Sequence, residues 1–173
     1  MILKINNMNF FKKLFRSKQK TEDCSCSPCQ CNSCDCEEDI SILLDLTEED
    51  KEVIKNLDEH IVVGKILEIT AHPDPEITKV RVTKTDLGNG KIEQILCGGV
   101  NIETGQIVAV ATVGTKLSPD FKISVRAIRG VDSHGMICAR NELGLSPASE
   151  QKGEIWEMAK NLETKLGTPL QNL

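Results

Sequence analysis

Aromatic side chains and long apolar runs are both scarce in this chain. It has no tyrosine, one tryptophan and four phenylalanines among 173 residues, so aliphatic side chains must fill its interior. No apolar run approaches the roughly 18 residues of a membrane span. Residues 1–20 also lack the apolar core and small-residue cleavage site of a secretory signal. From these absences we expect a soluble, cytoplasmic protein.

Catalytic motifs are missing as well. The nucleophile pattern Gly-x-Ser-x-Gly does not occur, and Ser133 has no evident base or acid partner in the sequence. Cys97 and Cys138 lie within apolar stretches, which predicts buried thiols and not nucleophiles or metal ligands. His72 precedes a proline, and we interpret it as a residue that fixes a loop by hydrogen bonding. The sequence therefore predicts a protein that is not an enzyme.

Charge is distributed unevenly along the chain. The formal net charge is −5, yet residues 1–20 carry six Lys and Arg and no acid. Residues 21–60 carry two basic side chains against thirteen acidic ones, and residues 61–145 carry ten against nine. The excess of acidic residues thus lies mostly outside residues 61–145, whose pattern predicts a fold most clearly. A near-neutral domain can still bind a polyanion when its cations share one face.

A dense cysteine cluster follows the basic segment. The spacings C-x-C and C-x-x-C let neighbouring sulfurs reach one soft metal ion. Four of the thiolates would complete a tetrahedral zinc site, or all six would hold a small zinc or copper cluster. A flexible, reduced linker and a redox-active tail are the alternatives, and no other cofactor is expected. The six residues are Cys24, Cys26, Cys29, Cys31, Cys34 and Cys36.

The hydrophobic pattern changes its period near residue 60. Residues 47–50 have the form of a helix capping box, followed by apolar residues at helical spacing, which predicts a linker helix. Beyond it, short β-branched segments alternate with turns about every ten residues, which predicts a small all-β barrel. The expected strands cover residues 61–69, 79–85, 92–97, 107–113, 121–128 and 135–139.

These patterns divide the chain into three parts. Residues 1–60 form an N-terminal extension that is basic, then Cys-rich, then acidic, and that ends in the linker helix. Residues 61–145 form the barrel. Residues 146–173 form a C-terminal extension, and we expect Trp156 to pack it onto the barrel.

Six ordered blocks of residues 61–145 resemble a family of tRNA-binding domains. Such domains occur in the N-terminal part of bacterial phenylalanyl-tRNA synthetase beta subunits, at the C-terminus of methionyl-tRNA synthetase, and as free-standing tRNA-binding proteins. The blocks are Val63–Ile66 with His72–Asp74, Lys79–Val82, Ile95–Asn101, Gly105–Val110, Arg129–Cys138 and Glu142–Leu145.

The resemblance implies a fold and a set of partners. The fold would be a five-stranded Greek-key OB-fold barrel with short flanking helices, preceded here by a largely disordered, Cys-rich extension. The implied partner is tRNA, recognised by shape and backbone contacts with little reading of bases. An aminoacyl-tRNA synthetase, whose reaction the domain would assist, and a second copy of the chain are further implied partners.

Cations and small polar groups at strand positions are the candidate RNA contacts. Several cations alternate along strands, so they could share one face of the barrel. Because Phe121 is the one aromatic residue between 61 and 145, contacts to phosphates and 2′-hydroxyls are favoured over base stacking. The candidates are Lys65, Lys79, Arg81, Lys84, Asn101, Lys122, Arg126, Arg129 and Ser133.

Two other functions stay open on the sequence alone. The chain could be an N-terminal portion or a split piece of a phenylalanyl-tRNA synthetase beta subunit. It could also be a thiolate metal-binding or redox module that uses the barrel as a scaffold.

Overall fold

The structure, a computed structural model, describes residues 46–146 and 152–173. The cysteine cluster of residues 24–36 and the predicted disorder of the extension lie outside these ranges. The predicted linker helix is present as α2 (Glu48–Lys55). Thr47 caps it: the Thr47 hydroxyl accepts a hydrogen bond from Asp50 N–H at 3.1 Å, and the Asp50 carboxylate accepts one from Thr47 N–H at 3.0 Å.

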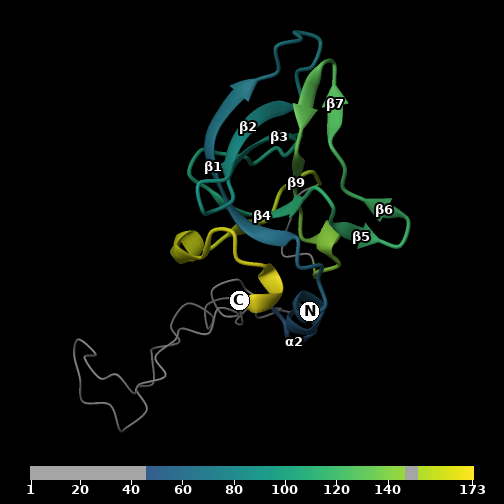
Figure 1. Ribbon diagram of the computed structural model, residues 1–173, viewed down its shortest axis with the longest axis vertical. Coiled ribbons are helices and arrows are strands. Elements are labelled where there is room, and N and C mark those ends of the chain that lie inside the picture. The colour runs from purple at the N-terminus through teal and green to yellow at the C-terminus, as the bar shows by residue number, and fades with distance from the viewer. Residues whose placement is uncertain (1–45, 147–151) are drawn as a thin grey trace, which may run out of the picture. The chain divides into compact units, whose positions relative to one another are not determined.

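One curved antiparallel sheet holds most of the strands. Its order is β10-β4-β1-β2-β3, and β9 also pairs with β4. Figure 1 shows β1 to β4 curving around a common interior. The all-β prediction, with short flanking helices, is therefore confirmed. The strands are β1 (Ile61–Ala71), β2 (Arg81–Asp86), β3 (Ile92–Cys97), β4 (Ile107–Thr112), β9 (Gly135–Ile137) and β10 (Glu157–Met158).

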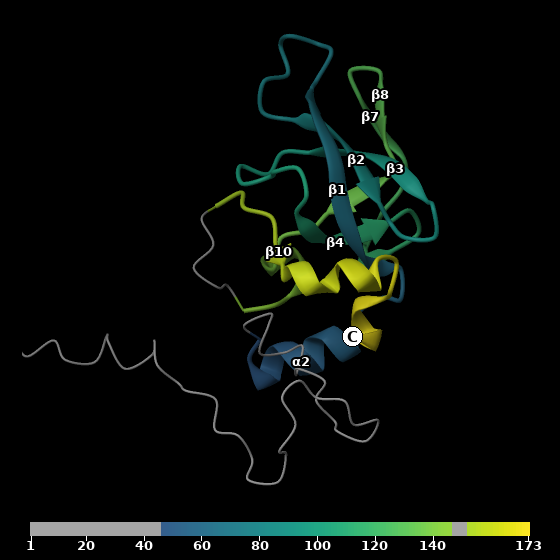
Figure 2. The same ribbon diagram turned by 90° about the vertical axis from the view of Figure 1, so that its left-hand side faces the viewer.

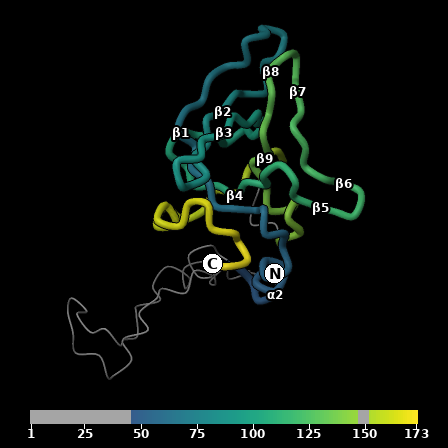
Figure 3. The backbone as a smooth tube through the Cα atoms, in the orientation of Figure 1, coloured from purple at the N-terminus to yellow at the C-terminus, as the bar shows by residue number. Residues whose placement is uncertain are grey.

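Two small ribbons stand apart from this sheet. They are β5 (Lys116–Ser118) with β6 (Phe121–Lys122), and β7 (Arg126–Ile128) with β8 (Val131–Ser133). Figure 3 traces both beside the main sheet. The single strand predicted over residues 121–128 is wrong, because the chain divides it between the two ribbons.

The physical reason for the division lies at Ile123. Its side chain is buried, and its backbone N–H and C=O bond to Thr115 and Gly114 at 2.8 and 2.9 Å. Residues 124–130 are all exposed, and β7 turns away to pair with β8. A sequence with strand-like alternation can thus pair with two different strands when one of its apolar residues is buried in the core between them.

β4 lies between two apolar layers. On one side, Ile107, Ala109 and Ala111 pack into an apolar cluster shared with residues 152–173, which we call the C-terminal segment. On the other side, Val108 and Val110 pack into the apolar cluster inside the curved sheet. All five residues are buried. A strand covered on both faces needs apolar residues at every position, which explains its continuous apolar run.

The C-terminal segment closes the outer side of the sheet. It contains the 3-10 helices η3 (Lys160–Lys165) and η4 (Leu170–Asn172), which follow η2 (Asn141–Leu143). Trp156 is buried, as expected, together with Leu162 and Leu170. Backbone hydrogen bonds join Val63 to residues 167 and 168. Figure 2 shows η3 running beneath β1 and β4.

Among the described residues, no helix is long and apolar enough to cross a membrane.

Candidate nucleic-acid interface

Residues 116–129, which we name the basic arm, carry four cations and one acidic side chain. Lys116 of β5 and Lys122 of β6 are directly opposite each other and exposed. Like charges placed opposite each other destabilise a ribbon unless an anion lies between them. No ion pair involves either lysine within the part of the chain that the structure describes. The β5–β6 ribbon is therefore suited to bind an anion.

Arg126 adds a third cation beside this pair. Its guanidinium carbon lies 5.6 Å from the centre of the Phe121 ring, a cation–π contact that orients the side chain. Phe121, Val125 and Ile128 are 38%, 48% and 37% exposed, so the arm combines charge with apolar surface. Such a surface can contact both the phosphates and the sugar faces of a nucleic acid.

Three of the predicted cations are paired with carboxylates: Lys65, Lys84 and, in the hairpin turn described below, Arg129. Lys65 on β1 contacts Glu163 of η3, and only a quarter of its side chain is exposed. Lys84 on β2 contacts Glu68 on β1 at 2.7 Å, with both side chains at least half exposed. Exposed pairs of this kind contribute little stability, so Lys84 can leave Glu68 for a phosphate. Lys65 instead helps to hold the C-terminal segment against β1 through its pair with Glu163.

Arg81 and Asn101 use their polar atoms to hold the chain between β3 and β4. The Arg81 guanidinium donates to the carbonyl oxygens of Gly99 and, at 3.4 Å, of Ile102. The Asn101 amide donates to the carbonyl oxygen of Ile155 at 3.1 Å and accepts from its N–H at 2.8 Å. Both side chains are half-buried and position backbone.

Ser133 is also used internally. Its hydroxyl accepts from Leu96 N–H at 2.9 Å and donates to the Gly135 carbonyl oxygen at 3.0 Å, and the residue is buried. It therefore joins β8 to β3. Lys79, in contrast, is exposed in the loop after β1, with no hydrogen bond or ion pair to another described residue.

The loop after β1 meets the β7–β8 hairpin at one end of the molecule (Figures 1 and 2). His72 is buried and lies between them, with Nε2 3.0 Å from the Ile128 carbonyl oxygen. Its Nδ1 accepts from Asp74 N–H at 3.1 Å. Because Nδ1 accepts, Nε2 is the nitrogen that donates a hydrogen bond, to the Ile128 carbonyl oxygen, so His72 fixes the loop as the sequence predicts.

Arg129 lies at this junction, in the turn of the hairpin. Its Nη2 is 3.6 Å from Glu76 Oε2, and its Nε is 4.0 Å from Asp74 Oδ2. The Arg129 side chain is 61% exposed, so these pairs are open to solvent and to exchange.

Lys116 belongs to the basic arm, although it is not among the candidates that the sequence indicates. Lys116 lies between the expected strands 107–113 and 121–128, so the sequence pattern places it on no strand. The signal that could have found it is the pair of lysines on either side of Pro119-Asp120, a turn that brings them opposite each other.

The two described cysteines are unsuited to chemistry. Burial raises the pKa of the Cys138 thiol to about 12, and burial also raises the pKa of Cys97. Both thiols are therefore protonated at neutral pH, as expected for buried cysteines. No group of three or more His, Cys, Asp or Glu side chains in residues 46–146 and 152–173 is arranged to hold a metal ion.

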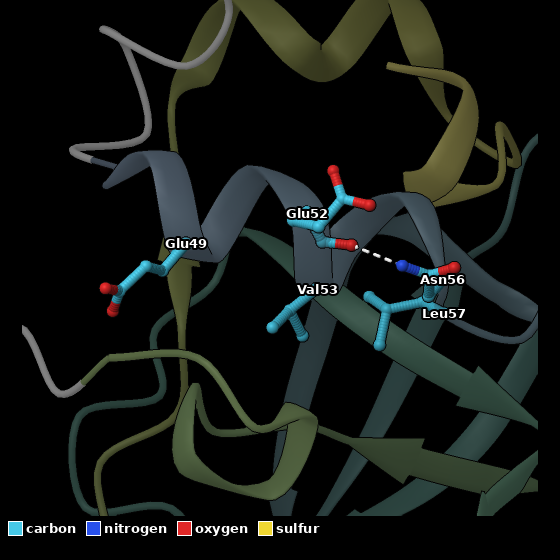
Figure 4. Close-up of a pocket in the computed structure, with 5 residues that line it drawn as sticks. All are labelled: Glu49, Glu52, Val53, Asn56 and Leu57. Atoms are coloured by element: carbon cyan, nitrogen blue, oxygen red, sulfur yellow. Dashed lines mark hydrogen bonds between the residues drawn. The ribbon is translucent and has the colours of Figure 1, made fainter.

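A separate hollow of about 510 Å³ lies along α2 (Figure 4). Val53 and Leu57 give it an apolar floor, and Glu49, Glu52 and Asn56 complete its lining. The Asn56 amide donates to the Glu52 carbonyl oxygen at 2.7 Å. Two of its lining residues are acidic and none is basic, so the lining does not favour an RNA phosphate.

Several phenylalanine–tRNA ligase beta subunits are similar to this chain. The subunit of Aliivibrio fischeri is 48% identical over 90 residues, which are 52% of this chain and 11% of the subunit. That of Wolinella succinogenes is 41% identical over 112 residues, which are 65% of this chain and 14% of the subunit. The chain thus matches less than a sixth of the length of either subunit.

A solved structure, the C-terminal domain of Plasmodium vivax p43, is 22% identical, with a TM-score of 0.35 over 46% of each chain. The family described as "Putative tRNA binding domain" matches residues 61–168. This match covers more than half of the chain, and it includes the sheet, the basic arm and most of the C-terminal segment. The chain therefore belongs to the tRNA-binding domain family.

Proposed function

We propose that this chain is a non-catalytic, cytoplasmic tRNA-binding protein that assists aminoacylation. The observation that carries the proposal is the basic arm, in which two opposed lysines and a stacked arginine lack carboxylate partners among the described residues. It lies within a domain whose family is described as tRNA-binding. Cations arranged in this way neutralise phosphates and release counterions from RNA.

The proposed contacts fall into two groups. Exposed cations would bind RNA phosphates directly, and the half-buried or internally bonded residues would position the strands that present them. The first group is Lys79, Lys84, Lys116, Lys122, Arg126 and Arg129; the second is Lys65, Arg81, Asn101 and Ser133.

The mode of binding would be recognition of shape. Phe121 is the one aromatic residue of the domain between 61 and 145, and its ring is already covered in part by Arg126. Stacking of several successive bases would need more exposed rings than this. We therefore expect folded tRNA to bind more tightly than single-stranded RNA of equal length, through phosphates and 2′-hydroxyls.

The experiment is a binding titration of tRNA at several salt concentrations. Replacing Lys116, Lys122 and Arg126 together by Ala should weaken binding and reduce the slope of log K against log salt by roughly 2, because up to three phosphate contacts are lost. A matched variant, K91A/K160A/K165A, removes the same charge from exposed positions off the arm. Equal losses in the two variants, or an unchanged slope in the first, would contradict the proposed surface.

A second candidate function is favoured by the relatives. Identities of 41 to 48% with ligase beta subunits suggest that the chain works beside a phenylalanine–tRNA ligase or forms part of one. Adding the chain to such a ligase should then raise the rate of aminoacylation at low tRNA concentration. An unchanged rate would contradict this second function, but it would not contradict tRNA binding.

Two further features stay proposals. We propose that the cysteines of residues 24–36 hold zinc or copper, which elemental analysis of the full chain and of a chain lacking these residues would test.

We also propose a homodimer, to be checked by sedimentation.

A further inference from the structure

Arg129 occupies a backbone position that disfavours it. Arg129 and Gly130 join β7 to β8, and their φ angles are 47° and 84°. A two-residue hairpin turn with positive φ at both positions prefers Asn, Asp or Gly at the first. Arginine there is strained, since its Cβ crowds the backbone. The turn itself therefore gives no reason for an arginine.

The side chain of Arg129 is held by charge and not by hydrogen bonds. Its distances to Glu76 and Asp74, 3.6 and 4.0 Å, both exceed hydrogen-bond length. No hydrogen bond from its guanidinium to another described residue is formed. Its fork of five N–H donors is thus available for a planar or tetrahedral oxyanion.

The loop that carries the two carboxylates is itself fixed close to the hairpin. His72 joins the Ile128 carbonyl, one residue before Arg129, to the backbone of Asp74. Asp74 Oδ1 in turn accepts from Glu76 N–H at 2.9 Å. The acidic loop and the arginine turn are therefore positioned together, while the ion pairs between them stay loose.

We propose that Arg129 binds an RNA phosphate, and that Asp74 and Glu76 hold its side chain in place until the phosphate replaces them. This inference rests on the proposed function. A phosphate offers the guanidinium two short, charge-assisted hydrogen bonds in place of two loose, solvent-exposed pairs. The carboxylates also repel the incoming RNA, so they lower its affinity and limit binding to RNA that reaches Arg129 in the correct orientation.

Substitution of Arg129 by Asn separates this role from a structural one. Asn-Gly suits the turn, so R129N should melt at the same temperature as the natural chain or higher. Its affinity for a mixed tRNA preparation should fall several-fold, and the slope of log K against log salt should decrease by about 1. Unchanged affinity and slope, or a lower melting temperature, would overturn the proposal.

The guarding role of the carboxylates has its own variant. Glu76→Gln removes the carboxylate while keeping the size of the side chain, and it should tighten tRNA binding. Glu103→Gln is the matched control, because Glu103 is exposed and pairs with no described cation. An equal gain in tRNA affinity in both variants would mean that only net charge matters, and it would refute the proposed role of the two carboxylates.

Failure of this inference is distinguishable from failure of the proposed function. A natural chain that binds no tRNA at low salt would refute the function. A natural chain that binds tRNA, together with an R129N variant that binds equally well, would refute the role of Arg129 alone.

Discussion

Single residues in this domain show how burial redirects polar side chains. Ser133 and Arg81 stand in the segments that resemble RNA-binding relatives, yet both bond to backbone groups of their own chain. A buried N–H or C=O group that loses its water must find another partner, and a nearby hydroxyl or guanidinium supplies it. Residues near a binding surface can therefore matter because they shape it.

Ser133→Ala tests this distinction. The substitution leaves the part-buried Leu96 N–H without its acceptor, which should lower the free energy of unfolding by about 1–3 kcal/mol. Thermal melting measures the loss. The control is Ser124→Ala, at an exposed position of the basic arm, and it should change stability by less than about 0.5 kcal/mol. Because Ser133 joins β8 to β3, a fall in the tRNA affinity of S133A is expected as an indirect effect, and an unchanged melting temperature would contradict this internal role.

At the scale of elements, α2 depends on partners that are distant in sequence. Asp50 accepts hydrogen bonds from Thr47 N–H and from Ser146 N–H, and it pairs with Arg140 at 3.1 Å. The Arg140 guanidinium lies 5.3 Å from the centre of the Trp156 ring. One carboxylate thus caps the helix and joins it to the chain after β9 and to the C-terminal segment.

Replacement of Asp50 by Ala should destabilise the fold strongly. Arg140 is 4% exposed, so removing Asp50 takes away a carboxylate that faces a buried charge, at a cost of about 3 kcal/mol or more. Denaturant unfolding would show the loss. Glu49→Ala removes an acid from the first turn of the same helix, where its side chain is exposed, and should cost less than about 1 kcal/mol. Similar losses in the two variants would contradict the role of the Asp50–Arg140 pair.

Two carboxylates, one near each end of the α2 region, stabilise the fold. Burial would raise the pKa of Asp50, but hydrogen bonds from the backbone of Ser146 and Thr47 outweigh it and lower that pKa to about 2. The backbone N–H of Lys116 is the largest cause that lowers the pKa of Asp58 to about 2, and hydrogen bonds from His60 add to it. Asp58 thereby fixes the start of the basic arm to the end of the helix region.

Stability should therefore fall in acid. Both folded-state pKa values lie below the ordinary value near 3.8, so the unfolded chain takes up protons first as the pH drops. The stabilisation is complete above about pH 5 and is lost as the pH falls through 4 towards 2. Each group contributes up to about 2 kcal/mol. Denaturant unfolding at several pH values measures this, and D58N should show a shallower dependence; an identical profile would contradict it.

The sequence by itself determined most of the local structure. The capping box at residues 47–50, the β-branched alternation of β2 and the continuous apolar run of β4 each depend on neighbours within one segment. Such local preferences are readable because they act over a few residues. The family resemblance of residues 61–145 was readable for the same reason, since its blocks are short and contiguous.

Tertiary structure alone decided which charges are available to a ligand. Lys65 and Glu163 are 98 positions apart, and Lys116 meets Lys122 only because the chain reverses between them. The sequence shows how many cations there are, but it does not show which side chain each of them meets. Electrostatic pairing depends on distance in space, and burial sets whether a pair exchanges with solvent, so the division between free and committed cations appears only once the chain has folded.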